Sequence, residues 1–161
     1  MTAGEYNSCV ERFSDGVYRF ILKSLRDSET ARDIVQETFL RLWENRSKII
    51  AGKEKSYLFT VAYRLMIDHI RYNKRYAEEE RIHSARSENG SAYTNLREIL
   101  SAALDRLPEL QKNLILLRDY EGYSYKEIGE ITGLSESQVK VYIFRGRVTL
   151  KEKLGKVENI I

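Results

Sequence analysis

The sequence predicts an all-α protein made of two small helical domains that a flexible linker joins. Apolar residues recur at steps of three and four along most of the 161-residue chain, which is the helical period. Helix formers are abundant and there is a single proline. Residues 77–94 lose this apolar rhythm and are rich in Glu, Ser, Asn and Gly, as linkers are. We therefore expect one domain at residues 1–76, a linker at 77–94 and a second domain at 95–161.

Net charge, cysteine content and the distribution of apolar residues limit the class of protein to which this chain can belong. The net charge is only +3, so any nucleic-acid surface must come from segregated charge. Cys9 is the one cysteine, which excludes an intramolecular disulfide and favours a reducing compartment. No apolar run approaches the ~20 residues of a membrane span, and the N-terminus lacks the pattern of a signal peptide. These features predict a cytoplasmic protein.

The first helical segment covers residues 5–25, where apolar residues follow helical spacing. Gly16 lies in the middle of this segment, and we expect it to bend or break the helix into two. The segment carries no group of residues that suggests chemistry. It is therefore interpreted as core.

The second segment, from Ser28 as the expected N-cap to Asn45, has one wide apolar face over three turns. Its opposite face is charged, with Leu40 exposed among the charges. One interpretation is a solvated face with ordinary helical ion pairs, since single apolar residues on a surface are common. The other is a docking surface, for which Leu40 is the hint. The residues of this face are Arg32, Asp33, Gln36, Glu37, Leu40, Arg41 and Glu44.

The third segment is a long helix expected from Ser56 to Tyr76, after a loop that contains Gly52. Its end is basic, with a net charge of +3 over residues 64–76. Cations among aromatic rings suit single-stranded nucleic acid, but cations are also stabilising at the negative end of any helix dipole. His69 lies among apolar residues and is interpreted as a core or groove-edge residue. The interleaved aromatic residues are Tyr57, Phe59, Tyr63, Tyr72 and Tyr76.

Two shorter helices are predicted next. The first covers residues 95–106, with an apolar stripe that begins at Leu96. Pro108 suits the first position of the following helix, which we expect to end near Gly122.

The stretch from Ser124 to Leu154 has the pattern of a helix-turn-helix. Ser124 and Glu127 form one capping box, and a serine and a glutamine at 135 and 138 form a second. Gly133 suits the left-handed position that ends the first helix, and Gly129 would let another helix approach closely. The second helix has a buried stripe on one side and, on the other, an exposed Phe144 among cations. The alternative is a plain helical hairpin with a solvated basic face. The stripe is Val139, Ile143, Gly146, Leu150 and Leu154.

The order of three stretches resembles the extracytoplasmic-function sigma factors of bacterial RNA polymerase. The stretches are SETARDIVQETFLRLW, YLFTVAYRLMIDHIRYNKR and LPELQKNLILLRDYEGYSYKEIGEITGLSESQVKVYIFRGRVTLKEKL. The resemblance implies an alternative sigma factor that binds core RNA polymerase, directs it to promoters and helps open the DNA. The first domain would be sigma region 2, and the second would be sigma region 4.

The resemblance also implies roles for individual residues. It favours the docking interpretation of the second segment, with the core polymerase interface at Asp33, Gln36, Glu37, Leu40 and Arg41. The third segment and the loop before it would read the minus-ten box and hold bases of the melted strand through Lys55, Tyr57, Arg64, Arg71, Tyr72, Lys74 and Arg75. The recognition helix would read the minus-thirty-five box through Gln138, Lys140, Val141, Phe144 and Arg145, with Ser137 on the same side and Arg147 and Lys151 as further phosphate contacts.

This chain departs from the family pattern at three of these positions. Many members have Asn in place of Arg64, and an amide can pair with a base edge where Arg offers only donors. Members often have Arg and Ser in place of Lys140 and Val141. The bases preferred at these positions are therefore expected to differ from the usual ones.

Partners and rival functions complete the expectations. The resemblance implies promoter DNA, both as duplex and as melted non-template strand, and an anti-sigma protein, which in this family is often membrane-bound. No cofactor, metal or small-molecule substrate is expected. A dimeric helix-turn-helix repressor is the main rival, although it would leave residues 28–76 without a role. A helical enzyme would need a convergent catalytic or metal site, and the sequence has no such set.

Overall fold

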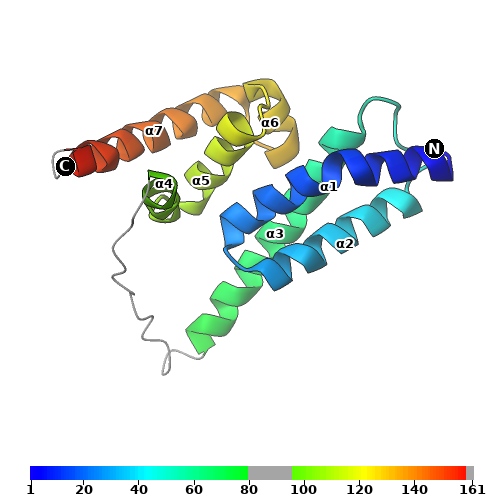
Figure 1. Cartoon of the computed structure of the whole chain (residues 1–161), viewed down its shortest axis with the longest axis horizontal. Helices are drawn as coiled ribbons and strands as arrows, with labels where there is room; N and C mark the ends of the chain where they lie inside the picture. Colours follow the sequence, from blue (N-terminus) through cyan, green and yellow to red (C-terminus); the bar gives the residue numbers. More distant parts are fainter. Residues whose placement is uncertain (80–95, 159–161) are drawn as a thin grey trace.

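The computed structural model describes residues 1–79 and 96–158, and these residues form helices and no strands. Figure 1 shows α1, α2 and α3 side by side in one module, with α4 to α7 in a second module beside it. The all-α prediction with two domains is therefore confirmed. The predicted linker lies outside the described residues, except for residues 77–79, which extend α3. The elements are α1 (Ala3–Leu25), α2 (Ser28–Glu44), α3 (Glu54–Glu79), α4 (Leu96–Asp105), α5 (Glu109–Ile115), the π-helical turn η1 (Leu116–Tyr120), α6 (Tyr125–Thr132) and α7 (Glu136–Glu158).

The first helix is continuous, so the predicted break at Gly16 is wrong. Glycine in a helix costs about 1 kcal/mol relative to alanine, which packing can offset. A Cβ on Gly16 would lie 3.4 Å from Oε2 of Glu121 and 3.7 Å from the ring of Phe59. These are ordinary van der Waals distances, so Gly16 lies in a packed region that α1 shares with α3 and the second module.

Helix starts differ from the prediction by one or two residues. The N-cap of α2 is Asp27 rather than Ser28, because a carboxylate oxygen of Asp27 accepts the backbone N–H of Glu29 at 3.1 Å. The third helix starts at Glu54 rather than at Ser56. Pro108 is the N-cap of α5 and not its first residue.

Two aromatic residues of α3 do not fit the nucleic-acid interpretation. Phe59 and Tyr63 are 1% and 9% exposed, so neither ring can stack on a base. Phe59 packs against Phe20 of α1 with ring centroids 5.8 Å apart. Both residues belong to the apolar side of the helix, and the sequence pattern did not separate them from the exposed aromatic residues.

The second module is assembled around α7, whose predicted buried stripe is confirmed for Val139, Ile143 and Leu150. A Cβ on Gly146 would lie 2.6 Å from Cδ1 of Ile115, so this glycine lets α7 pack closely on α5. Three predictions are corrected. The helix after Pro108 changes to a π-helical turn at Leu116. Leu96 is 72% exposed and outside the core. A Cβ on Gly129 would lie 2.8 Å from the carbonyl oxygen of Leu134, so this glycine makes room mainly for the turn before α7 rather than for the body of another helix.

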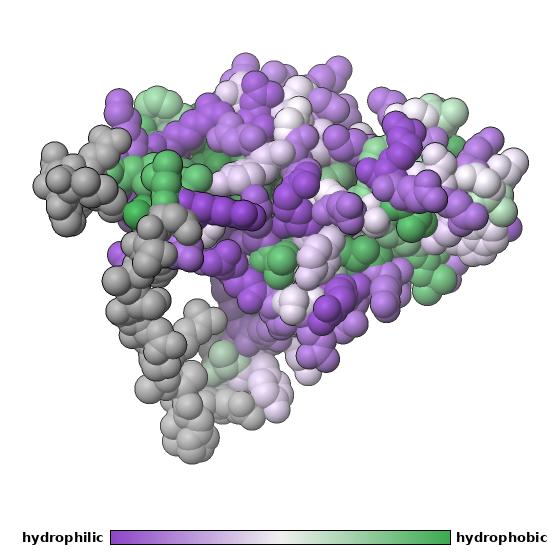
Figure 2. All heavy atoms as spheres, viewed as in Figure 1, coloured by the Kyte–Doolittle hydropathy of each residue, from purple (hydrophilic) through white to green (hydrophobic). Residues whose placement is uncertain are grey.

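The two modules pack directly against each other. Helix α6 contacts α3, and α5 and η1 contact α1, so the apolar cores of the modules join into one cluster. In Figure 2 the visible face is largely hydrophilic, with hydrophobic side chains in separate groups. The buried surface of each module is thus divided between its own core and the contact with its neighbour.

Candidate nucleic-acid interface

Two local hydrogen-bond motifs fix the helix-turn-helix. Oγ of Ser124 accepts the backbone N–H of Glu127 at 3.1 Å, and Oε1 of Glu127 accepts that of Ser124 at 3.0 Å. These bonds to the carboxylate lower the pKa of Glu127. Ser135 and Gln138 form the same pair of bonds at the start of α7, and Gly133 between them has φ of +80°. The predicted capping boxes and left-handed glycine are confirmed.

The outward side of α7 presents an apolar stripe to solvent. Phe144 is 69% exposed, with Val141 and Val148 also exposed beside it at helical spacing. Val148 was not among the predicted contact residues, although its spacing from Val141 and Phe144 was visible in the sequence. Thymine methyl groups are the apolar part of the major-groove edge. This face can therefore contact both apolar and charged parts of a duplex. The other exposed residues of the predicted set are Ser137, Gln138, Lys140, Arg145, Arg147 and Lys151.

Three side chains of the predicted recognition set already have partners within the module. Oε1 of Gln138 is the acceptor in the capping box, which leaves its amide N–H groups for other bonds. Nζ of Lys140 lies 3.6 Å from a carboxylate oxygen of Glu136. The guanidinium of Arg147 donates to Asp119 of η1 at 2.6 and 3.3 Å. To contact a phosphate, Arg147 must either keep its bond to Asp119 and donate to the phosphate as well, or release Asp119 first.

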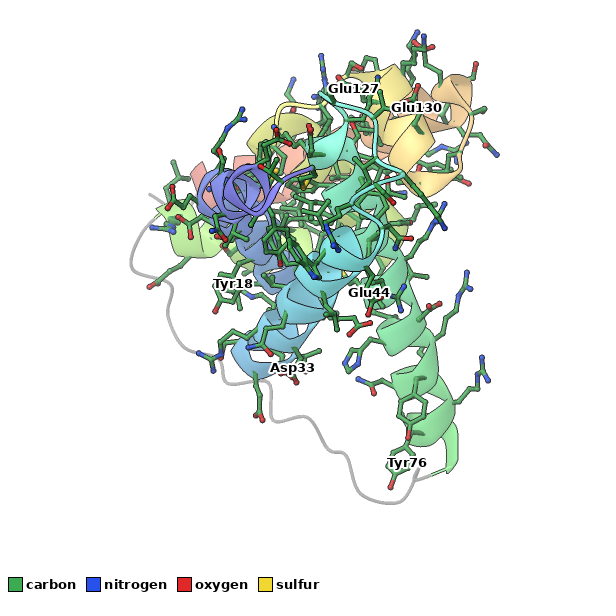
Figure 3. The ribbon with its side chains drawn as sticks, turned by 90° about the vertical axis from the view of Figure 1, so that its right-hand side faces the viewer. Tyr18, Asp33, Glu44, Tyr76, Glu127 and Glu130 are labelled. Carbon is green, nitrogen blue, oxygen red and sulfur yellow. The ribbon has the colours of Figure 1, made fainter. Side chains whose placement is uncertain are left out.

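The second half of α3 extends beyond its module, as Figure 3 shows with Tyr76 near its end. Tyr72 and Tyr76 are 65% and 51% exposed, and their rings stack with centroids 6.3 Å apart and planes 19° apart. Tyr76 was not in the set that the resemblance implied, but its spacing of four residues from Tyr72 was visible in the sequence. The stacked pair offers ring faces to a base. The predicted cations of this helix, all exposed, are Arg71, Lys74 and Arg75 near the pair and Arg64 two turns before it.

The start of α3 is more constrained. The hydroxyl of Tyr57 donates to the carbonyl oxygen of Arg41 at 3.3 Å and accepts from Nδ2 of Asn45 at 3.2 Å. Its half-buried ring lines an open hollow of about 390 Å³ beside the exposed Ile50. Lys55, two residues before Tyr57, lies with its ammonium 4.8 Å from the ring centroid of Tyr123 of the second module.

The outward face of α2 matches the predicted docking surface in its exposure. Leu40 is 49% exposed, and Asp33 lies on the outer side of the helix (Figure 3). Nε of Arg41 donates to Oε1 of Glu37 at 3.1 Å, so part of the face also carries the ordinary helical ion pair of the alternative interpretation. An apolar side chain surrounded by ordered charges can anchor a partner protein.

Other classes of site receive no support from the described ranges. Over residues 1–79 and 96–158, no group of three or more His, Cys, Asp and Glu side chains could hold a metal. His69 is half-buried and shares a hydrogen bond of 3.0 Å with Asn73. No helix of the described ranges is both long and apolar enough to cross a bilayer.

Comparison with known proteins gives a consistent result over both modules. Residues 9–76 match the family model "Sigma-70 region 2", and residues 97–150 match "Sigma-70, region 4". The ECF RNA polymerase sigma factor SigM of Bacillus subtilis is 29% identical over 92% of this chain and 94% of its own length. The ECF RNA polymerase sigma factor SigL of Mycobacterium tuberculosis is 30% identical over 84% of this chain and 83% of its own length.

Solved structures give the same fold. The sigma factor RpoE of Bartonella quintana, in complex with the anti-sigma factor NepR, aligns with a TM-score of 0.78 at 22% identity. That alignment covers 94% of this chain and 97% of that one. CnrH, in complex with the cytosolic domain of CnrY, aligns with a TM-score of 0.72 at 20% identity, over 96% of this chain and 90% of that one.

Proposed function

Because this chain belongs to the ECF sigma factors of the sigma-70 family, we propose how its two modules divide the work of promoter recognition. It is an alternative sigma factor that directs RNA polymerase to promoters, and its family consists of transcription initiation factors. Residues 1–76 dock on core polymerase and act on the minus-ten box, and residues 95–161 read the minus-thirty-five box. The observation that carries this division is the exposure of aromatic residues beside cations on two separate helices, α3 and α7.

The second module reads duplex DNA. Lys140, Arg145 and Lys151 contact phosphates and set the position of α7, because phosphate contacts supply affinity without sequence information. Val141 and Phe144 face base edges, where each good contact is worth about 1–3 kcal/mol. The capping box at Ser135 holds the start of α7, from which the groove is entered.

The first module traps melted DNA. Bases of the non-template strand stack on Tyr72, which Tyr76 supports from one turn further on, while Arg71 and Arg75 meet the phosphates. Trapping shifts the duplex toward the open form only because these groups bind the single strand better than the duplex. Tyr57 lines the hollow at the start of α3, and the exposed Lys55 contributes a cation to the same end of the helix.

Two protein partners belong to this function. Core polymerase docks on the outward face of α2, with Leu40 as the apolar anchor among Asp33, Gln36, Glu37 and Arg41. One solved neighbour described above is a complex of a sigma factor with an anti-sigma factor, which supports an anti-sigma protein as the regulator of this chain. We place the protein in the cytoplasm, where polymerase and chromosome are accessible.

Transcription in vitro tests the proposal. Core polymerase with the chain is incubated with fragmented genomic DNA, and the new transcripts are sequenced to identify a promoter. On that promoter, permanganate footprinting reports melted bases and run-off assays report initiation. Changing Arg71 and Arg75 to Gln should reduce melting and run-off by about tenfold or more while duplex binding through α7 remains.

The matched control removes the same charge elsewhere. Arg97→Gln in α4 with Arg106→Gln directly after it, both at exposed positions, should leave melting unchanged. If both double variants lost melting and run-off transcription equally, the total charge would be the cause and α3 would have no special role. Absence of any transcript with the unchanged chain would contradict the proposed function as a whole.

A further inference from the structure

An acidic residue lies beside one of the cations of α7. Asp119 is an exposed residue of η1, and the guanidinium of Arg147 donates to both of its carboxylate oxygens. Nη2 donates to Oδ1 at 2.6 Å, and Nε donates to Oδ2 at 3.3 Å. A carboxylate repels the phosphates of a duplex, so charge alone predicts that Asp119 weakens DNA binding. The bidentate pairing with Arg147 favours the opposite effect.

Arg147 lies on the same flank of α7 as two other cations. Lys140, Arg147 and Lys151 are seven and four residues apart in the sequence, and both steps return a helix to nearly the same side. All three are exposed, whereas Ile143 and Gly146 between them are buried. A row of cations along one flank of a helix can follow the phosphates of one DNA strand.

Tyr125, the first residue of α6, lies where cations of three elements approach one another. Its ring centroid is 4.6 Å from the guanidinium carbon of Arg118 and 5.8 Å from Nζ of Lys140. Hydrogen bonding to Asp119 is the main cause that raises the pKa of Arg147, and Tyr125 adds to this rise. Like charges repel one another, so the carboxylate of Asp119 favours the approach of Arg147 to the other two cations.

The pairing leaves part of the guanidinium available. A guanidinium has five N–H groups in one plane, and Arg147 directs two of them at Asp119, one on Nε and one on Nη2. The other three, two on Nη1 and one on Nη2, point away from this carboxylate. The side chains of Arg147 and Asp119 are 45% and 40% exposed. A phosphate can therefore reach the outer edge of the guanidinium without displacing Asp119.

A guanidinium that is already held in place binds a phosphate at a lower entropic cost. A mobile arginine side chain loses rotamer freedom when it binds. Asp119 fixes the side chain of Arg147 before DNA arrives, so most of this loss occurs in the free protein. The pair itself adds little to stability, because exposed ion pairs rarely do. We therefore expect its main effect in binding rather than in folding.

We propose that Asp119 is a positioning residue for recognition of the minus-thirty-five box: it holds Arg147 so that the guanidinium contacts a phosphate of the duplex while it keeps its bonds to the carboxylate. The inference rests on the proposed function, in which α7 reads this duplex. Removing the negative charge of Asp119 should therefore weaken promoter binding, although charge alone predicts the reverse.

Substitutions at both positions of the pair test the proposal in the holoenzyme. Binding to a promoter duplex, identified from its transcripts, is measured in the cold, where the DNA stays closed, at several salt concentrations. Arg147→Gln should weaken binding about fivefold and reduce the slope of log Kd against log salt concentration by about 0.9, the value for one phosphate contact. Asp119→Asn should change affinity and slope in the same direction, although it makes the protein more positive.

Three further variants separate positioning from charge. Glu152→Gln removes the same charge from an exposed position of α7, and it should bind the duplex at least as tightly as the unchanged protein. Asp119→Glu keeps a carboxylate and should retain most of the affinity. The double variant, D119N with R147Q, should bind no more weakly than R147Q alone, because two residues that act through one contact are not additive. Thermal unfolding followed by circular dichroism verifies that each variant is folded.

The outcomes separate the positioning role from the proposed function. If Asp119→Asn tightens binding or steepens the salt slope, Asp119 only repels DNA or withholds Arg147, and the positioning role is overturned. It is also overturned if Asp119→Asn weakens binding equally with and without Arg147, or if Arg147→Gln binds normally while Phe144→Ala does not. In these cases the assignment of α7 to the duplex stands. If neither Phe144→Ala nor Arg147→Gln alters binding, that assignment itself fails.

Discussion

Adjacent residues on α7 should respond in opposite ways to truncation to alanine. Phe144 is 69% exposed and Ile143 is 1% exposed, although they are neighbours in sequence. Phe144→Ala removes a side chain that makes few packing contacts in the free protein. Ile143→Ala removes one that fills the core of the second module.

The expected magnitudes follow from these exposures. Burying a phenylalanine fully is worth about 1.5–3 kcal/mol, and about two thirds of its surface is still available to DNA. Phe144→Ala should therefore weaken promoter binding by about 1–2 kcal/mol, or about five- to thirtyfold in Kd, with less than about 0.5 kcal/mol lost in stability. Ile143→Ala should lower the free energy of unfolding by about 2–5 kcal/mol, and it removes no side chain that faces the groove.

Two measurements decide the outcome. Urea denaturation followed by circular dichroism gives the free energy of unfolding of each variant. Binding of holoenzyme to a promoter duplex, measured at a temperature where both variants are folded, gives Kd. If Phe144→Ala bound the duplex as tightly as the unchanged protein, the assignment of this face of α7 to the major groove would be refuted. A large loss of stability in Phe144→Ala would refute the exposure on which the reasoning depends.

Three further predictions concern docking, packing and capping. Leu40→Asp should reduce binding to core polymerase about tenfold or more without changing the thermal midpoint, and co-elution with core polymerase measures it; unchanged binding would contradict the docking face. Gly146→Ala should destabilise the chain by about 1 kcal/mol in urea, since overpacking outweighs the gain in helix propensity, whereas Gly155→Ala, with open space around it, should stabilise it by about 0.5–1 kcal/mol; the same sign for both would contradict the packing at Gly146. The pKa of Glu127 is lowered in the folded chain, so its charge stabilises the cap of α6 above the usual glutamate pKa, and this stability is lost as the pH falls through the lowered value. Glu127→Gln should thus be less stable than the unchanged protein at pH 7, with the difference shrinking as the pH falls below the usual glutamate pKa and through the lowered one; a difference that persists after Glu127 is protonated would show that the charge is not the cause.

The sequence identified the features whose partners lie three or four residues apart. The capping boxes at Ser124 and Ser135 and the left-handed Gly133 were predicted and are present. Their geometry depends on local dihedral angles and on hydrogen bonds within one turn of helix. For the same reason the order of the helices and the buried stripe of α7 were predictable.

The predictions that are wrong concern residues whose conformation or burial depends on residues far away in the sequence. Gly16 does not break α1, because Phe59 and Glu121 pack against it from elsewhere in the chain. Phe59 and Tyr63 have helical spacing like that of the exposed rings of α3, but both are buried, and Phe59 packs against Phe20 of α1 and Tyr123 of the second module. The sequence pattern gives the period of a helix, whereas the position of neighbouring helices decides which polar or aromatic residues are covered.

By itself, the sequence determined the helical class, the helix-turn-helix and the family, because each follows from spacing along the chain. Only the tertiary structure placed Lys112 and Asn113 in a buried contact with Ser24, some 90 residues away, and paired Arg19 with Glu121. These side chains look like ordinary surface residues in the sequence. Ser24, Lys112, Asn113 and the side chain of Glu121 are buried where the two modules meet, and a contact between distant residues depends on the packing of whole helices rather than on any local pattern.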